Sequence, residues 1–134
     1  MTVQIAGTRD RQLRADVRRL ARRVGRDFDV GPVRVSVVFC TNPYIHGLNR
    51  RFLKRDRPTD VMAFPNEPQN PRTLEPPLLG EVYVSRDQAR IQAREYGATY
   101  ARELRRLVLH GLLHLCGLTH RQMEPLYRRY LEDR

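Results

Sequence analysis

The segment from Thr99 to Gly117 constrains the fold most, because it predicts a helix that is apolar on nearly every side. A helix without a polar face has to be buried. Thr99 can cap its start, and Gly117 can end it with a left-handed turn. The rest of the 134-residue chain must therefore cover this helix, and we expect one domain over residues 1–134. The apolar residues of the helix are Leu104, Leu107, Val108, Leu109, Leu112, Leu113 and Leu115.

Hydrophobic periodicity divides the remaining chain into short strands and helices. An apolar stripe from Leu13 to Val24 predicts an amphipathic helix, and Gly25 is expected to end it. Five prolines between Pro65 and Pro77 predict a mobile surface loop. The pattern predicts an α+β domain in which helices cover a mixed sheet of about four strands. The expected strands are Thr2–Ala6, Val33–Phe39, Asp60–Phe64 and Glu81–Val84, and the further helices are Asp10–Val24, Pro43–Leu53, Arg86–Tyr96 and Arg121–Glu132.

The charge of the chain points to a polyanionic partner. The net charge is +10, and all of the 25 basic residues except Lys54 are arginine, whose planar fork matches phosphate geometry. We therefore expect RNA or another nucleic acid as a partner. Six arginines between Arg11 and Arg23 lie on the polar side of the first helix, where both RNA contact and a simple solvated face remain open.

The composition also bears on compartment and redox state. No segment approaches the roughly 20 apolar residues that cross a bilayer, and the first seven residues lack a signal-like pattern. We therefore expect a cytoplasmic protein with no membrane partner. Cys40 and Cys116 are too few for a disulfide framework and are expected to be reduced.

Three of the four histidines form the strongest chemical signal in the sequence. His110 and His114 are four residues apart and share one face of the buried helix, and the turn at Gly117 can return His120 to the same point. The metzincin proteases have this spacing, but Gly111 stands where they carry a glutamate base. Three neutral imidazoles suit a catalytic zinc ion with an open fourth position, so we predict one zinc per chain.

Two neighbouring candidates are interpreted as structural. Cys116 lies two residues beyond His114 and points to nearly the opposite side of a helix, so we assign it to the core. His46 stands alone on an earlier helix and is interpreted as a surface or capping residue.

The order and spacing of three segments resemble the YbeY family, bacterial endoribonucleases that act in rRNA maturation. The segments are Leu48–Pro65, Leu79–Ser85, and Arg102–Leu104 running into His110–His120. The resemblance implies a single α+β domain, zinc on the three histidines as the catalytic centre, and cleavage of single-stranded RNA. It also implies processing of the small-subunit rRNA 3′ end and ribosome quality control, with ribosomal particles as partners and no small-molecule organic cofactor.

The chain departs from this family at two positions. Leu53 stands where many members have an arginine, and Thr119 stands where the family motif has an aspartate before the third histidine. Arg51 or Arg55 is therefore the expected RNA-contacting residue near that position. Glu81, Asp60 and a metal-bound hydroxide acting alone remain open as the general base.

Two alternative functions remain open at this point. One is a zinc-dependent protease or amidase, against which the absence of an acid at position 111 weighs. The other is a non-catalytic RNA-binding factor of ribosome assembly, in which zinc is structural and a nearby carboxylate closes the site.

Overall fold

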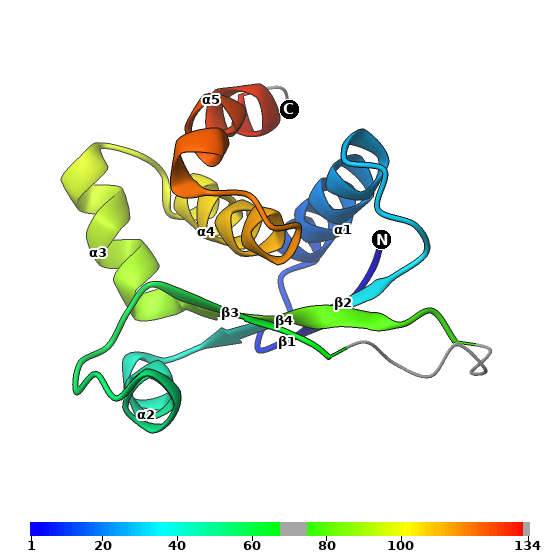
Figure 1. Ribbon diagram of the computed structural model, residues 1–134. Coiled ribbons are helices and arrows are strands. Elements are labelled where there is room, and N and C mark those ends of the chain that lie inside the picture. The colour runs from blue at the N-terminus through cyan, green and yellow to red at the C-terminus, as the bar shows by residue number, and fades with distance from the viewer. Residues whose placement is uncertain (68–74, 133–134) are drawn as a thin grey trace.

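The computed structural model describes residues 1–67 and 75–132, which fold into a four-stranded mixed sheet with five helices (Figure 1). The strand order is β1-β2-β4-β3, in which β1 and β4 run parallel to β2. β3 runs antiparallel to β4 and forms an edge of the sheet. This confirms the predicted α+β domain with a mixed sheet. The strands are β1 (Thr2–Ala6), β2 (Arg34–Cys40), β3 (Val61–Pro65) and β4 (Leu78–Ser85).

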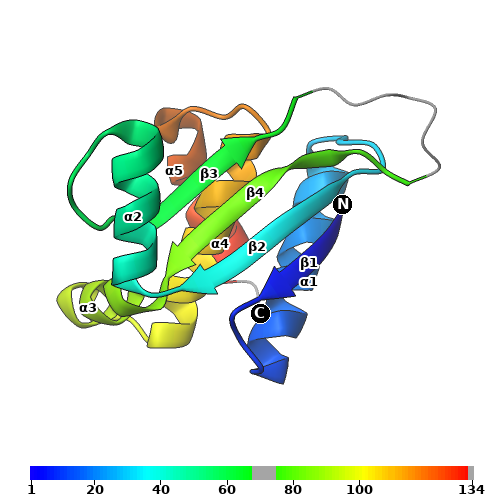
Figure 2. The same cartoon turned by 90° about the horizontal axis from the view of Figure 1, so that it is seen from below.

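Helices cover both faces of the sheet. Helices α1 and α4 pack on one face, α5 lies over α4 on the same side, and the opposite face carries α2 (Figures 1 and 2). The alternation of side chains along β4 explains this arrangement, because Val82 and Val84 are buried with the α1 and α4 residues while Tyr83 packs beside Ile45 of α2. The helices are α1 (Arg11–Asp27), α2 (Asn42–Leu53), α3 (Arg86–Tyr96), α4 (Tyr100–Leu115) and α5 (His120–Leu131).

Helix α4 forms the centre of the core, as its apolar sequence predicts. Six of its aliphatic side chains are at most 3% exposed, and burying each one stabilises the fold by about 1.5–3 kcal/mol. Gly111 brings the helix close to the sheet, because a Cβ atom at this position would lie 2.4 Å from Val82 Cγ1. The six residues are Leu104, Leu107, Val108, Leu109, Leu112 and Leu113.

The predicted caps are confirmed, whereas the predicted end of α1 is wrong. The side chains of Ser85 and Thr99 accept backbone N–H bonds at the starts of α3 and α4. Gly25 does not end α1, which continues to Asp27. A glycine stands here because the N-terminus approaches closely: a Cβ atom on Gly25 would lie 3.0 Å from Met1 Cβ. Packing inside the helix therefore requires the small residue at position 25, and no turn does.

Some arginines of α1 bind the protein itself. The Arg14 guanidinium donates to the carbonyl oxygens of Ile5 and Thr8, and Arg23 donates to Tyr130 O at 3.2 Å. These two side chains tie α1 to β1 and α5, so neither is a simple solvated charge.

The proline-rich segment is described only at its two ends. Pro65 is the last residue of β3, and β4 begins at Leu78, so the predicted surface loop is shorter than Pro65–Pro77. Its central residues, 68–74, lie outside the described residues. Within the part of the chain that the structure describes, no helix has the length and apolar character needed to cross a membrane.

Candidate functional site

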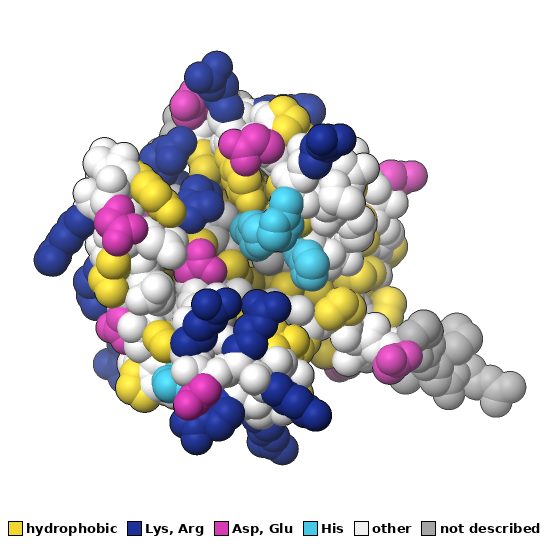
Figure 3. Space-filling view, turned by 60° about the vertical axis from the view of Figure 1, so that its left-hand side comes forward, with side chains coloured by type: hydrophobic (Ala, Val, Ile, Leu, Met, Phe, Trp, Pro, Cys, Tyr) yellow, Lys and Arg dark blue, Asp and Glu magenta, His cyan; other side chains and the backbone are white. Residues whose placement is uncertain are grey.

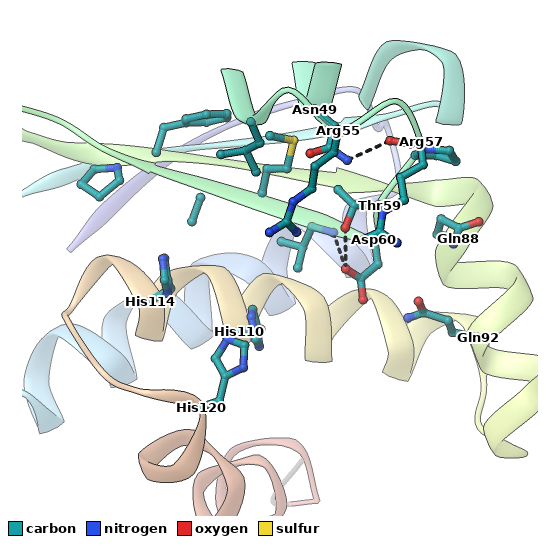
Figure 4. A pocket seen from close by; sticks show the side chains of 17 residues that line it. Asn49, Arg55, Arg57, Thr59, Asp60, Gln88, Gln92, His110, His114 and His120 are labelled. Atoms are coloured by element: carbon teal, nitrogen blue, oxygen red, sulfur yellow. Dashed lines mark hydrogen bonds between the residues drawn. The ribbon is translucent and has the colours of Figure 1, made fainter. Parts of the chain in front are cut away.

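The three histidines of the predicted centre line one cleft. Helix α4 presents His110 and His114 one turn apart, and the chain then turns at Gly117, whose φ is +86°. Helix α5 begins at His120, so its first residue faces the same cleft (Figure 4). The cleft has a volume of about 890 Å³ and lies around the edge strand β3.

His110 is held from two sides. Its ring lies edge-on to the ring of His120, with 5.0 Å between the centroids. Its Nδ1 atom is hydrogen-bonded to the Tyr127 hydroxyl at 2.6 Å, so α5 orients a side chain of α4. This bond leaves Nε2 of His110 as the nitrogen that can bind a ligand in the cleft.

The chemistry of these donors fits a zinc ion. Burial, and then the charge of His120, lower the pKa of His110, which favours the neutral ring that a metal requires. Zinc-binding histidines commonly use the other ring nitrogen in a hydrogen bond such as the one to Tyr127. The described residues hold no three His, Cys, Asp or Glu side chains that are grouped to bind a metal ion as they stand. His114 is exposed and would have to turn toward His110 and His120, so the three-histidine centre stays a prediction.

Basic residues line the cleft across from the histidines. Arg55 and Arg57 belong to the loop after α2, and Figure 4 shows them on the side of the cleft opposite α4. Asn49, which is 2% exposed, anchors this loop, since its side chain donates to Arg57 O and its carbonyl accepts from Arg55 N. Figure 3 shows Lys and Arg side chains gathered across the hollow from the histidines. The cleft thus combines histidines with arginines, side chains of the types that can ligate a metal and bind an anion.

The two arginines predicted to contact RNA have different positions. Arg55 lines the cleft, whereas Arg51 lies outside its lining and places its guanidinium carbon 5.3 Å from the centroid of the Phe52 ring. Leu53 also lines the cleft, which is where the resemblance placed an arginine. Arg57 was missed because a loop sequence does not indicate which of its cations turns inward.

The structure separates the two carboxylates that the sequence left open. Asp60 lines the cleft, and its Oδ1 atom accepts from Val61 N at 2.8 Å. Glu81 lies on the α2 face of β4, one residue out of phase with the buried Val82, and accepts a bond from the Tyr83 hydroxyl. Of the two carboxylates, only Asp60 lines the cleft.

An ion pair between buried Glu103 and partly buried Arg106 supports the α3 end of the cleft. Gln88 and Gln92 line this end, and Gln92 donates to Glu103 at 3.2 Å. Glu103 is 1% exposed and is paired with Arg106, whose pKa it raises. The Arg106 guanidinium carbon also lies 5.9 Å from the Tyr127 ring centroid, so this pair connects α3 with the tyrosine that holds His110. The glutamines carry no sequence signal that distinguishes them from surface residues.

Position 111 faces the sheet and not the cleft. Gly111 is buried against Val82, whereas His110 and His114 point into the cleft. A glutamate at this position would collide with β4 before its carboxylate reached a substrate. The glycine is therefore explained by packing, and the metzincin comparison extends only to the histidine spacing.

Three further residues have structural roles. Thr119 caps α5 through a reciprocal pair of bonds with Gln122, a role that an aspartate at this position could also fill. His46 lies outside the cleft lining, and its Nε2 atom is hydrogen-bonded to Asp56 Oδ1 at 2.8 Å. Cys116 packs against the core, in agreement with its interpretation as a core residue.

Comparisons with known proteins agree with the class that this fold and cleft define, a small α+β protein with histidines at the junction of two C-terminal helices. The family model described as Endoribonuclease YbeY matches residues 3–130. The chain therefore belongs to the YbeY family.

Individual relatives carry the same name. The chain is 40% identical over 93 residues to the Endoribonuclease YbeY of Bacillus pumilus, a match that covers 64% of this chain and 58% of that protein. It is 42% identical over 103 residues to the one of Pelotomaculum thermopropionicum, covering 74% and 68%. The alignments thus span less than two thirds of the first relatives' length.

A solved structure has a similar fold. The solution structure of TM1509 from Thermotoga maritima superimposes with a TM-score of 0.69 at 29% identity. The superposition covers 98% of this chain and 87% of the other, so the sheet and helices described above are shared over nearly the whole length.

Proposed function

We propose that this protein is a zinc-dependent endoribonuclease that cuts single-stranded RNA. Its cellular task would be small-subunit rRNA 3′-end maturation and ribosome quality control, with rRNA and ribosomal particles as partners. The observation that carries the proposal is one cleft lined by three histidines on one side and by Arg55 and Arg57 on the other. The family description adds the reaction class.

His110, His114 and His120 would hold the zinc ion. When bound, zinc supplies polarisation of a phosphoryl oxygen or a bound water whose pKa falls to roughly 7. The Tyr127 hydroxyl fixes the ring of His110 and leaves its Nε2 for this task.

The side chains across the cleft would position the RNA. Arg55 and Arg57 can donate to phosphate oxygens and offset negative charge that develops during cleavage. Asp60 has one carboxylate oxygen committed to the backbone of Val61, which leaves the other to accept or return a proton. Gathering this set of residues in one cleft favours a flexible single strand, because a stiff duplex adapts its backbone poorly to such a site.

The test is cleavage of one labelled single-stranded RNA. Wild type should cleave it, and both a chelated sample and His110→Ala should lose cleavage. His46→Ala is the matched control, because His46 lies outside the cleft, and it should cleave like wild type. Cleavage by the chelated sample and by His110→Ala at the wild-type rate would contradict the proposal. A parallel incubation with peptide substrates should show no hydrolysis, and hydrolysis would favour the protease alternative.

A further inference from the structure

Phe52 is a large apolar side chain left open to solvent at the rim of the cleft. It is 54% exposed, although it stands in the last turn of α2 beside the buried face of that helix. The next residue, Leu53, lines the cleft, and so does Phe64, whose ring contacts Phe52. The ring of Phe52 is therefore a flat surface next to the path by which a substrate enters.

A row of aromatic rings fixes the position of Phe52. Its ring meets Phe64 edge-to-face with 5.3 Å between centroids, and Phe64 meets Tyr83 in the same way at 5.8 Å. Tyr83 in turn lies 6.2 Å from Tyr44 at the other end of α2. Because the Phe52 ring packs on Phe64 of β3, its exposed surface is held in place and loses little side-chain freedom on binding.

The charge around Phe52 suits a polyanion. Five exposed cations fall within eight residues of the chain, against one carboxylate, Asp56, which is already paired with His46 and Arg50. The Arg51 guanidinium carbon lies 5.3 Å from the centroid of the Phe52 ring, within reach of a phosphate next to a base on that ring. An aromatic ring among cations is the arrangement on which proteins stack the bases of single strands. The cations are Arg50, Arg51, Lys54, Arg55 and Arg57.

We propose that Phe52 is a base-stacking platform that binds one unpaired nucleobase of the RNA beside the cleft. This inference rests on the proposed function and adds to it a physical reason for single-strand preference. A paired base in a duplex has both faces covered by its neighbours, whereas an unpaired base can stack on Phe52 while its phosphates contact the flanking arginines. The cleft then receives the adjoining phosphate.

The experiment uses the absence of tryptophan from the sequence. Phe52→Trp makes the platform the single tryptophan of the protein, and a stacked base should quench its fluorescence. The probes are a mixed-sequence single-stranded RNA, the same RNA annealed to its complement, and inorganic polyphosphate, which carries charge without bases. Chelator is present throughout, so binding is measured without cleavage. Tyr44→Trp is the matched control, because Tyr44 is 53% exposed on the same helix and lies outside the cleft.

Single-stranded RNA should quench Phe52→Trp, and duplex RNA and polyphosphate should leave its emission unchanged. Tyr44→Trp should respond to none of the three. In a separate titration, Phe52→Ala should bind the single strand about five- to tenfold more weakly. This loss corresponds to the lower end of the range measured when one base–aromatic stacking contact is removed. Tyr44→Ala should bind like wild type.

The outcomes separate this inference from the proposed function. Unchanged affinity of Phe52→Ala together with unquenched Phe52→Trp overturns the platform while RNA cleavage by wild type stands. Equal quenching by polyphosphate also overturns it, because the signal would then come from charge alone. Failure of wild type to bind RNA at low salt overturns both. Far-UV circular dichroism verifies that the exposed substitutions leave the fold intact.

Discussion

Replacing Gly111 with alanine tests how helix α4 is seated on the sheet. The added Cβ atom would lie 2.4 Å from Val82 Cγ1 and 2.9 Å from Cγ2. Val82 is fully buried in the middle of β4, so its short branches have no space into which they can move. Helix α4 and strand β4 must therefore move apart. This movement shifts His110, which lies on α4, relative to the sheet beneath the cleft.

The expected loss of stability follows from two opposing contributions. Overpacking a close-packed core costs about 1–3 kcal/mol, and an approach about 1 Å inside ordinary contact belongs in the upper half of that range. Alanine in place of glycine within a helix recovers about 1 kcal/mol. The free energy of unfolding of Gly111→Ala should therefore fall by about 1–2 kcal/mol.

Urea unfolding with matched variants measures this difference. Gly47→Ala is the control, because Gly47 also lies inside a helix but has no atom within 4 Å of its added Cβ. It should be stabilised by about 0.5–1 kcal/mol. Adding Val82→Ala to Gly111→Ala should make the double variant more stable than the sum of the single changes, because the collision is removed. If Gly111→Ala is as stable as wild type at an unchanged m-value, the close seating of α4 is refuted.

Three further predictions concern α5 and the cleft. Tyr127→Phe should weaken zinc affinity by about 10- to 100-fold in chelator competition, because His110 loses its orienting bond; unchanged affinity would contradict that role. The Tyr130 hydroxyl lowers the pKa of Asp27 below 3.8, so this bond stabilises the fold above that pH and its contribution is lost as the pH falls through the lowered pKa. Tyr130→Phe should raise the pKa of Asp27 toward 3.8 in a carboxylate NMR titration, and an unmoved pKa would remove Tyr130 as its cause. Leu53→Arg should strengthen RNA binding and steepen the log–log salt dependence by about 0.7, and an unaltered slope would show that position 53 makes no phosphate contact.

Local features of the fold could be predicted from the sequence because neighbouring residues determine them. The strand Thr2–Ala6 and the caps at Ser85 and Thr99 follow from alternation and side-chain chemistry within a few residues. Gly25 shows the limit of such reasoning. Its role depends on contact with Met1, which precedes β1 and lies far from Gly25 in the sequence. A glycine required by close packing looks like one required by a turn until the partner is known.

The composition of the cleft was predicted for its three histidines and for Arg55, but not for most of its remaining lining. His110 and His114 share one face of α4, and the turn at Gly117 returns His120 to the same cleft, so residues close in the sequence indicate this side of the cleft. Asn49 comes from α2 and Gln92 from α3, and the strand order that brings these two helices to the same cleft is a property of the whole fold. The choice between Asp60 and Glu81 likewise depended on which face of the sheet each one occupies.

The measurement that tests the central claim most directly is the zinc content of four single histidine variants. Each purified variant is loaded with zinc, freed of excess metal and analysed for metal per chain. Wild type and His46→Ala should retain one zinc, because His46 is engaged with Asp56 outside the cleft. His110→Ala, His114→Ala and His120→Ala should each lose it. Stoichiometric zinc in His114→Ala, the exposed histidine that has to turn toward the other two, would contradict a centre built on all three.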